Sequence, residues 1–323
     1  MNEIEISVVV PVYNEEGNVK ELHQKIVTAC EGLHKSYEII FIDDGSTDRT
    51  ASECRSLKPL TLIELRKNFG QTAAFDAGFK KSQGKIIITM DGDLQNDPAD
   101  IPKLLKKMKD GYDVVSGWRY RRKDPLSKKI FSRTADKLRK ILLKDKIHDS
   151  GCSLKAYDGE ALRQVDLFGE MHRFIPALLE LDGYNIGEVK VSHHPRIHGV
   201  TKYNWRRSVK GFVDMIFIWF WRKYASRPLH FFGGSGILLG MIGTGILIWM
   251  AILKIVYGAS LSEKIWPLIG VLFMVIGVQF FIFGVLMDVV IKNYYKLHNR
   301  MNYTVKEVHQ QEKGISLGDN ESS

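Results

Sequence analysis

Along the first part of the chain, short apolar runs rich in Val and Ile alternate with segments in which apolar residues recur at helical spacing. The apolar runs cover residues 6–12, 38–42, 61–65, 85–90 and 113–117, and clear helical patterns cover residues 19–30 and 101–109. Strands that alternate with helices indicate a mostly parallel sheet with helices on both faces. The pattern therefore predicts an α/β domain whose ligands bind beyond the carboxyl ends of the strands.

Two later segments contain no Lys, Arg, Asp or Glu, namely residues 228–253 and 265–287. A helix needs about 20 residues, at roughly 1.5 Å each, to cross a hydrocarbon core of about 30 Å. We therefore expect two membrane spans, the alternative being two helices buried in a soluble core. Glycines in the first segment predict a close contact with the second span or with another subunit. These are Gly233, Gly234, Gly236, Gly240 and Gly243.

Basic residues flank the two spans unevenly. Lys202, Arg206, Arg207, Lys210, Arg222, Lys223 and Arg227 precede the first span, and Lys292, Lys296 and Arg300 follow the second. The connecting loop offers Lys254 and Lys264. Because cytoplasmic loops carry the excess of Lys and Arg, we expect a multi-pass protein of the cell membrane. Its N-terminal domain and both termini would lie in the cytoplasm.

Residues 206–226 mix basic residues with a run of aromatic and aliphatic ones. We interpret this segment as an amphipathic helix at the membrane interface, the alternative being a helix buried in the soluble domain. The predicted organisation is a soluble domain over residues 1–204, interfacial helices over 205–228, two transmembrane helices over 229–291 and a cytoplasmic tail over 292–323. The polar end of the tail is expected to be disordered.

Charge and cysteine content limit the class of protein. Lys and Arg number 46 against 37 Asp and Glu, which gives a formal net charge of +9, and there are three cysteines. Three cysteines without paired short spacing argue against a disulfide-stapled secreted scaffold. The positive charge predicts an anionic partner. Because no aromatic-basic motif of a nucleic-acid reader is present, we do not expect that partner to be a nucleic acid.

Acidic residues follow several of the predicted strands. Asp91-Gly92-Asp93-Leu94-Gln95 follows one strand, Pro11-Val12-Tyr13-Asn14-Glu15 closes the first, and Asp43-Asp44-Gly45-Ser46 follows the second. Carboxylate and amide oxygens suit Mg²⁺ or Mn²⁺, although an isolated Asp-x-Asp is more often a polar turn. Acidic residues that meet at one sheet edge repel one another unless a cation or hydrogen-bond donors lie between them. The combination therefore favours a metal site.

Together these stretches resemble the family 2 glycosyltransferases, whose GT-A fold is Rossmann-like with a mostly parallel sheet. The resemblance runs from Ser7 to about Trp205 and is strongest to membrane-attached polyprenyl-phosphate sugar transferases, such as dolichyl-phosphate mannosyltransferases and bacterial undecaprenyl-phosphate glycosyltransferases. Its motifs are Asn68-Phe69-Gly70, Asp91-Gly92-Asp93-Leu94-Gln95 followed by Pro98, Gly117-Trp118-Arg119, Ser150-Gly151-Cys152-Ser153-Leu154-Lys155, His172-Arg173-Phe174-Ile175-Pro176, and His194-Pro195-Arg196 leading to Gly199-Val200-Thr201-Lys202-Tyr203.

The resemblance implies a role for individual residues. Nucleotide-sugar binding falls to Pro11, Tyr13, Glu15, Asp44, Asp91, Gly92, Asp93 and Lys202, with Asp44 at the base or ribose. Asp91, Asp93 and Gln95 would hold the metal, and Asp91, Asp93 and Arg119 would form the catalytic centre. The acceptor's phosphate would be bound by Lys128, Ser132 and Arg133, with Arg196 and His198 from a loop that closes over the donor. Lys128 and His198 stand where some relatives carry Arg.

These roles predict metal-dependent transfer of a single sugar from a UDP- or GDP-linked donor to undecaprenyl or dolichyl phosphate at the cytoplasmic face. The product would supply lipid-linked sugar for cell-envelope glycans or glycoconjugates. A phosphate acceptor is already anionic near neutral pH, so the protein must mainly position two anions and neutralise charge. Because no Ser-His-Asp or Cys-His arrangement is evident, we expect direct displacement with inversion at the anomeric carbon.

Two other functions are compatible with parts of the sequence. A processive polysaccharide synthase uses a related domain but needs more spans and a Gln-x-x-Arg-Trp motif, which is absent. A non-catalytic, membrane-anchored sugar-binding scaffold is disfavoured by the presence of Asp91, Asp93 and Gln95 together. The sugar, the nucleotide and the polyprenyl chain stay open. A homo-oligomer is expected, with a tetramer favoured by the resemblance.

Overall fold

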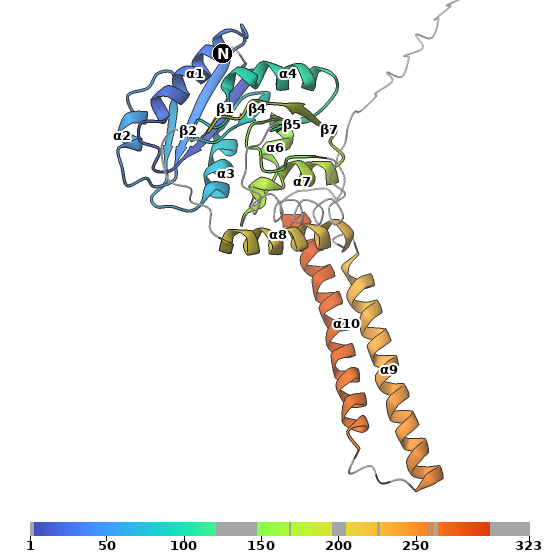
Figure 1. Ribbon diagram of the computed structural model, residues 1–323. Helices are drawn as coiled ribbons and strands as arrows, with labels where there is room; N and C mark the ends of the chain where they lie inside the picture. The colour runs from blue at the N-terminus through green and yellow to red at the C-terminus, as the bar shows by residue number, and fades with distance from the viewer. Residues whose placement is uncertain are drawn as a thin grey trace, which may run out of the picture. The chain divides into compact units, whose positions relative to one another are not determined.

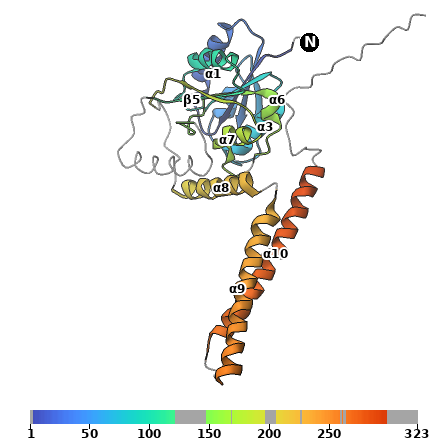
Figure 2. The ribbon, with the colours of Figure 1, turned by 90° about the vertical axis from the view of Figure 1, so that its right-hand side faces the viewer.

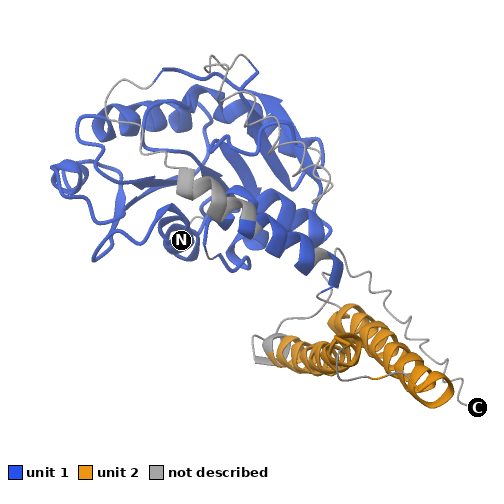
Figure 3. Ribbon diagram, turned by 60° about the horizontal axis from the view of Figure 1, so that its bottom comes forward, with its two compact units in different colours: residues 1–225 blue, residues 226–323 orange. Residues whose placement is uncertain are grey.

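The computed structural model describes residues 3–120, 147–167, 169–195, 205–224, 227–258, 260 and 264–297. The chain forms two compact units, residues 1–225 and 226–323, which are described separately (Figure 3). The first unit is a layered α/β domain and the second is a pair of long helices.

The sheet of the first unit has seven strands in the order β3-β2-β1-β4-β6-β5-β7. They are β1 (Ile6–Val12), β2 (Tyr37–Asp43), β3 (Thr61–Glu64), β4 (Ile86–Thr89), β5 (Val114–Trp118), β6 (Lys155–Asp158) and β7 (Ile186–Lys190). All neighbours pair in parallel except β6, which runs antiparallel to both β4 and β5. The predicted mostly parallel sheet is confirmed.

Helices cover both faces of this sheet (Figures 1 and 2). One face packs against α1 (Val19–Glu31) and α4 (Ile101–Lys109), the other against α3 (Gln71–Lys81), α6 (Gly159–Arg163) and α7 (Ile175–Leu181). The short helices α2 (Thr50–Cys54), η1 (Pro98–Asp100) and η2 (Met171–Arg173) lie between these elements in the chain. Every residue of β1 is buried, because a strand covered on both faces needs apolar side chains on both.

The strand β6 was not predicted, and it changes which segments reach the carboxyl edge of the sheet. Lys155, its first residue, lies opposite Thr89 near the end of β4 and Ser116 on β5. Because β6 is antiparallel, the segment that precedes it, residues 149–154, lies where the parallel strands end. This segment thereby joins the sites predicted after β4 and β5.

Helix α8 (Trp205–Tyr224) belongs to the first unit and packs one side against the rest of it. Met215 and Ile218 are buried with Met171, Phe174 and Ala177. On the same helix Val213, Ile216 and Phe217 are exposed, at 58%, 41% and 39%. The helix thus has one apolar side that completes the domain and further apolar residues that are exposed. Its location at a membrane surface stays a prediction.

The second unit consists of α9 (Pro228–Tyr257) and α10 (Trp266–Leu297), both long and apolar enough to cross a membrane. Only 17% of the most apolar stretch of each helix is buried, unlike a core helix of a soluble domain. Glycines let the two backbones approach closely, because a Cβ on Gly236 would lie 2.5 Å from the Gly277 carbonyl oxygen. A Cβ on Gly243 would lie 2.6 Å from the Gly270 oxygen. Of the two contacts predicted for these glycines, the one with the second long helix is therefore present.

Candidate active site

The motif Asp91–Gln95 begins at the carboxyl end of β4 and turns sharply. Leu94 has a φ of 59°, and its side chain is 2% exposed. A left-handed conformation costs an L-residue about 1–2 kcal/mol, so this turn is held by its surroundings rather than by local preference. The turn brings the Gln95 backbone N–H to 3.1 Å from Asp93 Oδ1. Asp93 itself is buried, with an exposure of 6%.

Asp91 is a half-buried carboxylate with another carboxylate beside it. Gln71 Nε2, at the start of α3, donates to Asp91 Oδ1 at 2.6 Å. Burial raises the pKa of Asp91, and the charge of Asp93 raises it further, against the opposing effects of Ser153, Arg119 and Gln71. A bound cation would relieve this repulsion. The carboxylate oxygens of Asp91 and Asp93 are therefore suited to binding a hard cation such as Mg²⁺ or Mn²⁺.

The ligand set at this position is incomplete by itself. Within the described ranges, no group of three or more His, Cys, Asp or Glu side chains could hold a metal ion. Mg²⁺ is commonly bound through one or two carboxylates together with substrate phosphates and water. Asp91 and Asp93 fit that arrangement, with the Gln95 amide as a further oxygen donor. The metal roles of these three residues stay predictions.

The first strand end lies directly against this motif. A Cβ on Gly92 would lie 2.9 Å from a Val12 methyl, 3.3 Å from the Pro11 carbonyl oxygen and 3.6 Å from Glu15 Cγ. Glu15 is fixed in turn, because its backbone N–H donates to Thr50 Oγ1 at 2.8 Å. The structure therefore brings the predicted nucleoside segment, Pro11 to Glu15 with Tyr13 between them, into contact with the predicted metal motif.

Asp44 follows β2 and is 4% exposed. Its two carboxylate oxygens accept backbone N–H groups, from Phe69 at 2.7 Å and from Gly70 at 2.9 Å. Burial raises the pKa of Asp44 and Asp43 adds to the effect, while these two hydrogen bonds oppose it. Asp44 therefore fixes the Asn68-Phe69-Gly70 motif. This structural role was not predicted, because the resemblance implied only a contact of Asp44 with the base or ribose.

Arg119 follows β5 and pairs with Asp149. Arg119 Nε lies 2.7 Å from Asp149 Oδ2, Nη2 lies 2.8 Å from Oδ1, and the Arg119 backbone N–H lies 3.2 Å from Oδ2. Burial alone would lower the pKa of Arg119, but the hydrogen bonds and charge of Asp149 outweigh it and raise the pKa. The guanidinium therefore stays charged at the edge where phosphates are expected.

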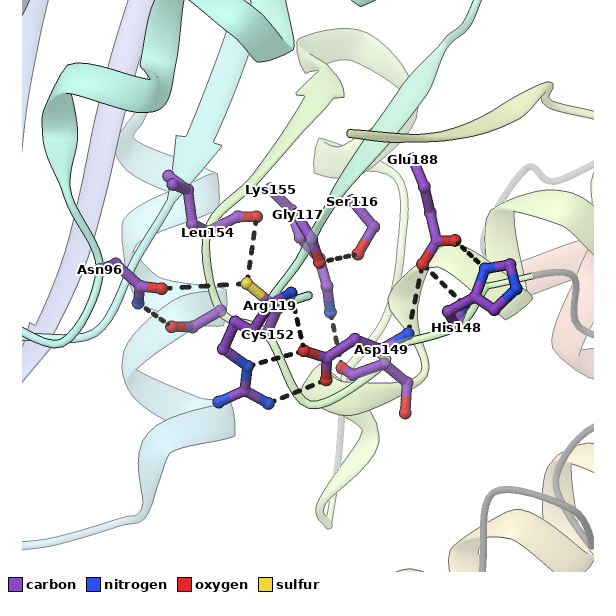
Figure 4. A network of polar contacts seen from close by, with 12 residues as sticks. Asn96, Ser116, Gly117, Arg119, His148, Asp149, Cys152, Leu154, Lys155 and Glu188 are labelled. Atoms are coloured by element: carbon purple, nitrogen blue, oxygen red, sulfur yellow. Dashed lines mark hydrogen bonds and ion pairs between the residues drawn. The ribbon is translucent and has the colours of Figure 1, made fainter. Parts of the chain in front are cut away.

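Polar contacts of the segment before β6 reach Arg119 on one side and, on the other, Asn96, which directly follows the metal motif (Figure 4). Asn96 Nδ2 donates to Ser153 Oγ at 2.6 Å, and the Asn96 Oδ1 oxygen faces Cys152 Sγ at 3.8 Å. Cys152 is 1% exposed, and burial raises its pKa to about 11. It is therefore a packed residue and not an activated nucleophile.

Sequence reasoning missed two partners of the predicted site residues, Gln71 and Asp149. Gln71 directly follows the Asn68-Phe69-Gly70 motif, and Asp149 directly precedes Ser150, so adjacency to a motif was the available signal. Neither contact is readable without the fold, because Gln71 bonds a residue twenty positions away and Asp149 one thirty positions away.

Six predicted site residues lie outside the described residues. They are Lys128, Ser132, Arg133, Arg196, His198 and Lys202. Their assignments to acceptor phosphate and nucleotide sugar stay predictions. What the described part of the chain brings together is Pro11, Glu15, Asp44 with its loop, the Asp91–Gln95 motif and Arg119.

Comparisons with known proteins identify relatives of this chain. Residues 7–166 match the model of glycosyl transferase family 2. Dodecaprenyl-phosphate galacturonate synthase of Rhizobium johnstonii is 39% identical over 314 residues, which cover 94% of this chain and 93% of the relative.

Solved glycosyltransferase structures share the fold of the first unit. Glucosyl-3-phosphoglycerate synthase of Mycobacterium tuberculosis, in complex with Mn²⁺, UDP-glucose and phosphoglyceric acid, superimposes with a TM-score of 0.54 at 18% identity, over 68% of this chain and 79% of that one. Mannosyl-3-phosphoglycerate synthase of Rubrobacter xylanophilus gives a TM-score of 0.56 at 16% identity, over 66% and 72%. These matches confirm the predicted GT-A fold. The family match and the 39% identity to a polyprenyl-phosphate sugar synthase over nearly the whole chain lead to the same conclusion. This chain belongs to glycosyl transferase family 2 and is a glycosyltransferase.

Proposed function

We propose that this glycosyltransferase moves a single sugar from a nucleotide sugar to a polyprenyl phosphate at the cytoplasmic face of a membrane. The observation that carries the proposal is the meeting of opposite charges at one sheet edge. Asp91 and Asp93, Asp44 and the paired Arg119 come from separate strand ends and converge there. Such an edge suits a reaction between two phosphate-bearing substrates.

The acceptor supplies its own nucleophile in this reaction. A polyprenyl phosphate oxygen is anionic near neutral pH, so the protein needs to orient it rather than deprotonate it. Arg119 would bind a phosphate through the N–H groups that Asp149 leaves uncommitted. A metal held by Asp91, Asp93 and Gln95 would neutralise the departing nucleoside diphosphate. Attack opposite the leaving group forms the new C–O bond as the old one breaks, with inversion at the anomeric carbon.

Membrane attachment fits the same substrate. Helices α9 and α10 are long enough to span a bilayer. The uneven flanking charges support an orientation with the catalytic domain and both termini in the cytoplasm. The exposed side of α8, with Val213, Ile216 and Phe217, would meet the headgroup region. The glycosyltransferase domain would then stand beside the phosphate end of its lipid acceptor.

A donor screen would identify the sugar, and one relative suggests the first donor to assay. The R. johnstonii relative is named for galacturonate on dodecaprenyl phosphate, so UDP-galacturonic acid is the first donor to assay. UDP-glucose, UDP-N-acetylhexosamines and GDP-mannose complete the screen. The purified full-length protein in detergent should release a nucleoside diphosphate from one of them, with undecaprenyl phosphate as acceptor and Mn²⁺ or Mg²⁺ present. Absence of product with every donor would refute the proposal.

Variants separate the roles within this reaction. Asp93→Asn should abolish turnover and weaken Mn²⁺ binding, and normal activity would exclude the metal role. Lys128→Ala and Arg133→Ala should raise KM for the lipid phosphate more than KM for the donor, and equal effects would exclude acceptor binding there.

Topology and assembly have tests of their own. Ser260→Cys should be labelled from outside intact cells; labelling only after permeabilisation would overturn the orientation. Light scattering of the purified protein would test the proposed tetramer, with a monomer as the contradicting result.

A further inference from the structure

Asp149 holds Arg119 in a buried, bidentate geometry. Two parallel N–H···O contacts of 2.7 and 2.8 Å join the two side chains, and each side chain is 12% exposed. A guanidinium carries five N–H groups, so this pairing uses two and leaves three. Within the described part of the chain, the structure gives the Arg119 side chain no other hydrogen bond. The remaining N–H groups are therefore available to a ligand.

Asp149 is itself fixed by its surroundings, so it acts as the anchor of the pair. The backbone N–H groups of His148 and Asp149 donate to Glu188 Oε1 at 2.7 and 3.2 Å. The His148 ring contacts Glu188 Oε2 at 2.7 Å (Figure 4). It also stacks on Trp118, with 4.6 Å between the ring centroids. The backbone at Asp149 is therefore held by Glu188, and from there the Asp149 carboxylate sets the direction of the Arg119 guanidinium.

The pair lies close to the predicted metal ligand Asp91. The segment that begins with Asp149 reaches the end of β4 four residues later, because the Ser153 carbonyl oxygen accepts from Thr89 Oγ1 at 2.7 Å and the Ser153 hydroxyl accepts from Asn96 Nδ2 at 2.6 Å. Between them, a Cβ on Gly151 would lie 3.1 Å from Arg119 Nη2. The charge of Arg119 is near enough to act on Asp91. Without its anchor, the guanidinium is free to turn to Asp91 and compete with a cation for it.

We propose that Asp149 is a positioning residue, which keeps the Arg119 guanidinium off Asp91 and directs its three remaining N–H groups toward a substrate phosphate. This inference rests on the proposed function for the identity of the phosphate. The phosphate belongs either to the nucleotide sugar or to the lipid acceptor, two sources that share one chemistry. The anchoring itself concerns Arg119, Asp149 and Asp91 alone.

Binding of Mn²⁺ alone tests the anchoring without any turnover. In the full-length protein, Asp149→Asn frees Arg119 to pair with Asp91 and should weaken Mn²⁺ binding about 10-fold, the lower end of the usual loss for a residue that orients a ligand. Adding Arg119→Gln removes the competing cation and should restore affinity to within about threefold of the wild type. A purely structural role for Asp149 predicts no such rescue.

Matched variants keep this test decisive. Asp113→Asn is the control, because it makes the same chemical change just before β5 begins, whereas Arg119 follows the end of that strand. The Asp113 carboxylate accepts the Asn185 backbone N–H at 2.7 Å. It should leave Mn²⁺ affinity unchanged. If Asp149→Asn does not fold, Arg119→Lys replaces it, because a lysine cannot make the bidentate pair and leaves a mobile cation beside Asp91. Wild-type affinity in Asp149→Asn or Arg119→Lys, or weaker binding in the double variant than in Asp149→Asn, would overturn the proposal.

Steady-state kinetics identify the phosphate. With undecaprenyl phosphate and the donor found in the screen, Asp149→Asn should lower kcat about 10- to 100-fold. A selective rise in KM for undecaprenyl phosphate assigns the Arg119 N–H groups to the acceptor, and a selective rise for the donor assigns them to the diphosphate. Unchanged kcat and KM would overturn the inference. A wild-type protein without turnover would instead refute the proposed function, while the Mn²⁺ measurements would still decide the anchoring.

Discussion

Asp91→Asn should stabilise the metal-free protein while it removes activity. Asp91 is half-buried beside Asp93, and burial followed by the Asp93 charge raises its pKa above the ordinary 3.8. Asparagine has the same shape. Its Oδ1 can still accept from Gln71 Nε2, now 2.6 Å from Asp91 Oδ1. The substitution therefore removes a repelling charge and keeps the hydrogen bond to Gln71.

The expected gain follows from the usual size of such relief. Removing an unfavourable active-site charge yields about 0.5–2 kcal/mol. In a domain of roughly 150–250 residues, each 1 kcal/mol moves the unfolding midpoint by about 2–4 °C. Thermal unfolding of the full-length protein in detergent and chelator at pH 7.5 would measure this shift. Asp110→Asn is the control, because the Asp110 side chain is 57% exposed and its contact with Lys107 spans 3.4 Å. It should change stability little.

The pH dependence has a definite sign. A carboxyl whose folded-state pKa is raised binds a proton more readily in the folded state, so its contribution to stability falls as pH rises through that pKa. The advantage of Asp91→Asn over the wild type should therefore be absent below about 3.8, grow as the pH rises from there, and be complete above the folded-state pKa of Asp91. Mn²⁺ should raise the wild-type midpoint and leave that of the variant unchanged. A variant less stable than the wild type at pH 7.5, or a gap that persists in acid, would refute the reasoning.

Three further outcomes follow from close contacts and burial. Gly92→Ala puts a methyl group 2.9 Å from the Val12 side chain of β1 and should lower kcat/KM about tenfold. Gly32→Ala is the control, because its nearest neighbour is the Thr28 carbonyl oxygen at 3.6 Å, and it should not change kcat/KM. Gly236→Leu should separate α9 from α10 and lower the detergent melting temperature, whereas Gly234→Leu, with nothing within 4 Å, should not. Cys152, whose pKa is raised to about 11, should resist thiol reagents at pH 8 until the protein unfolds; rapid labelling of the native protein would contradict its burial.

The apolar pattern predicted the framework because burial on both faces leaves a local signature. The run at residues 6–12 is β1 (Ile6–Val12), and the pattern at 101–109 is α4 (Ile101–Lys109). The charge-free segments likewise correspond to α9 and α10, since length and apolarity along one segment decide whether it can span a bilayer. The acidic motif after β4 was also recognisable from the sequence, because its residues are contiguous in the chain.

Contacts between distant segments were decided by the tertiary structure alone. The sequence marked Ser150 to Lys155 as a motif, but only the antiparallel pairing of β6 with β4 and β5 shows that this motif lies at the active-site edge. The hydrogen bond of Gln71 to Asp91 and the pairing of Asp149 with Arg119 depend on the same long-range arrangement. The sequence by itself determined which residues bear charge and which segments are buried, because both are properties of local composition. Which charges meet was decided by the order and direction of the strands, because side chains far apart in the chain become neighbours only when the sheet forms.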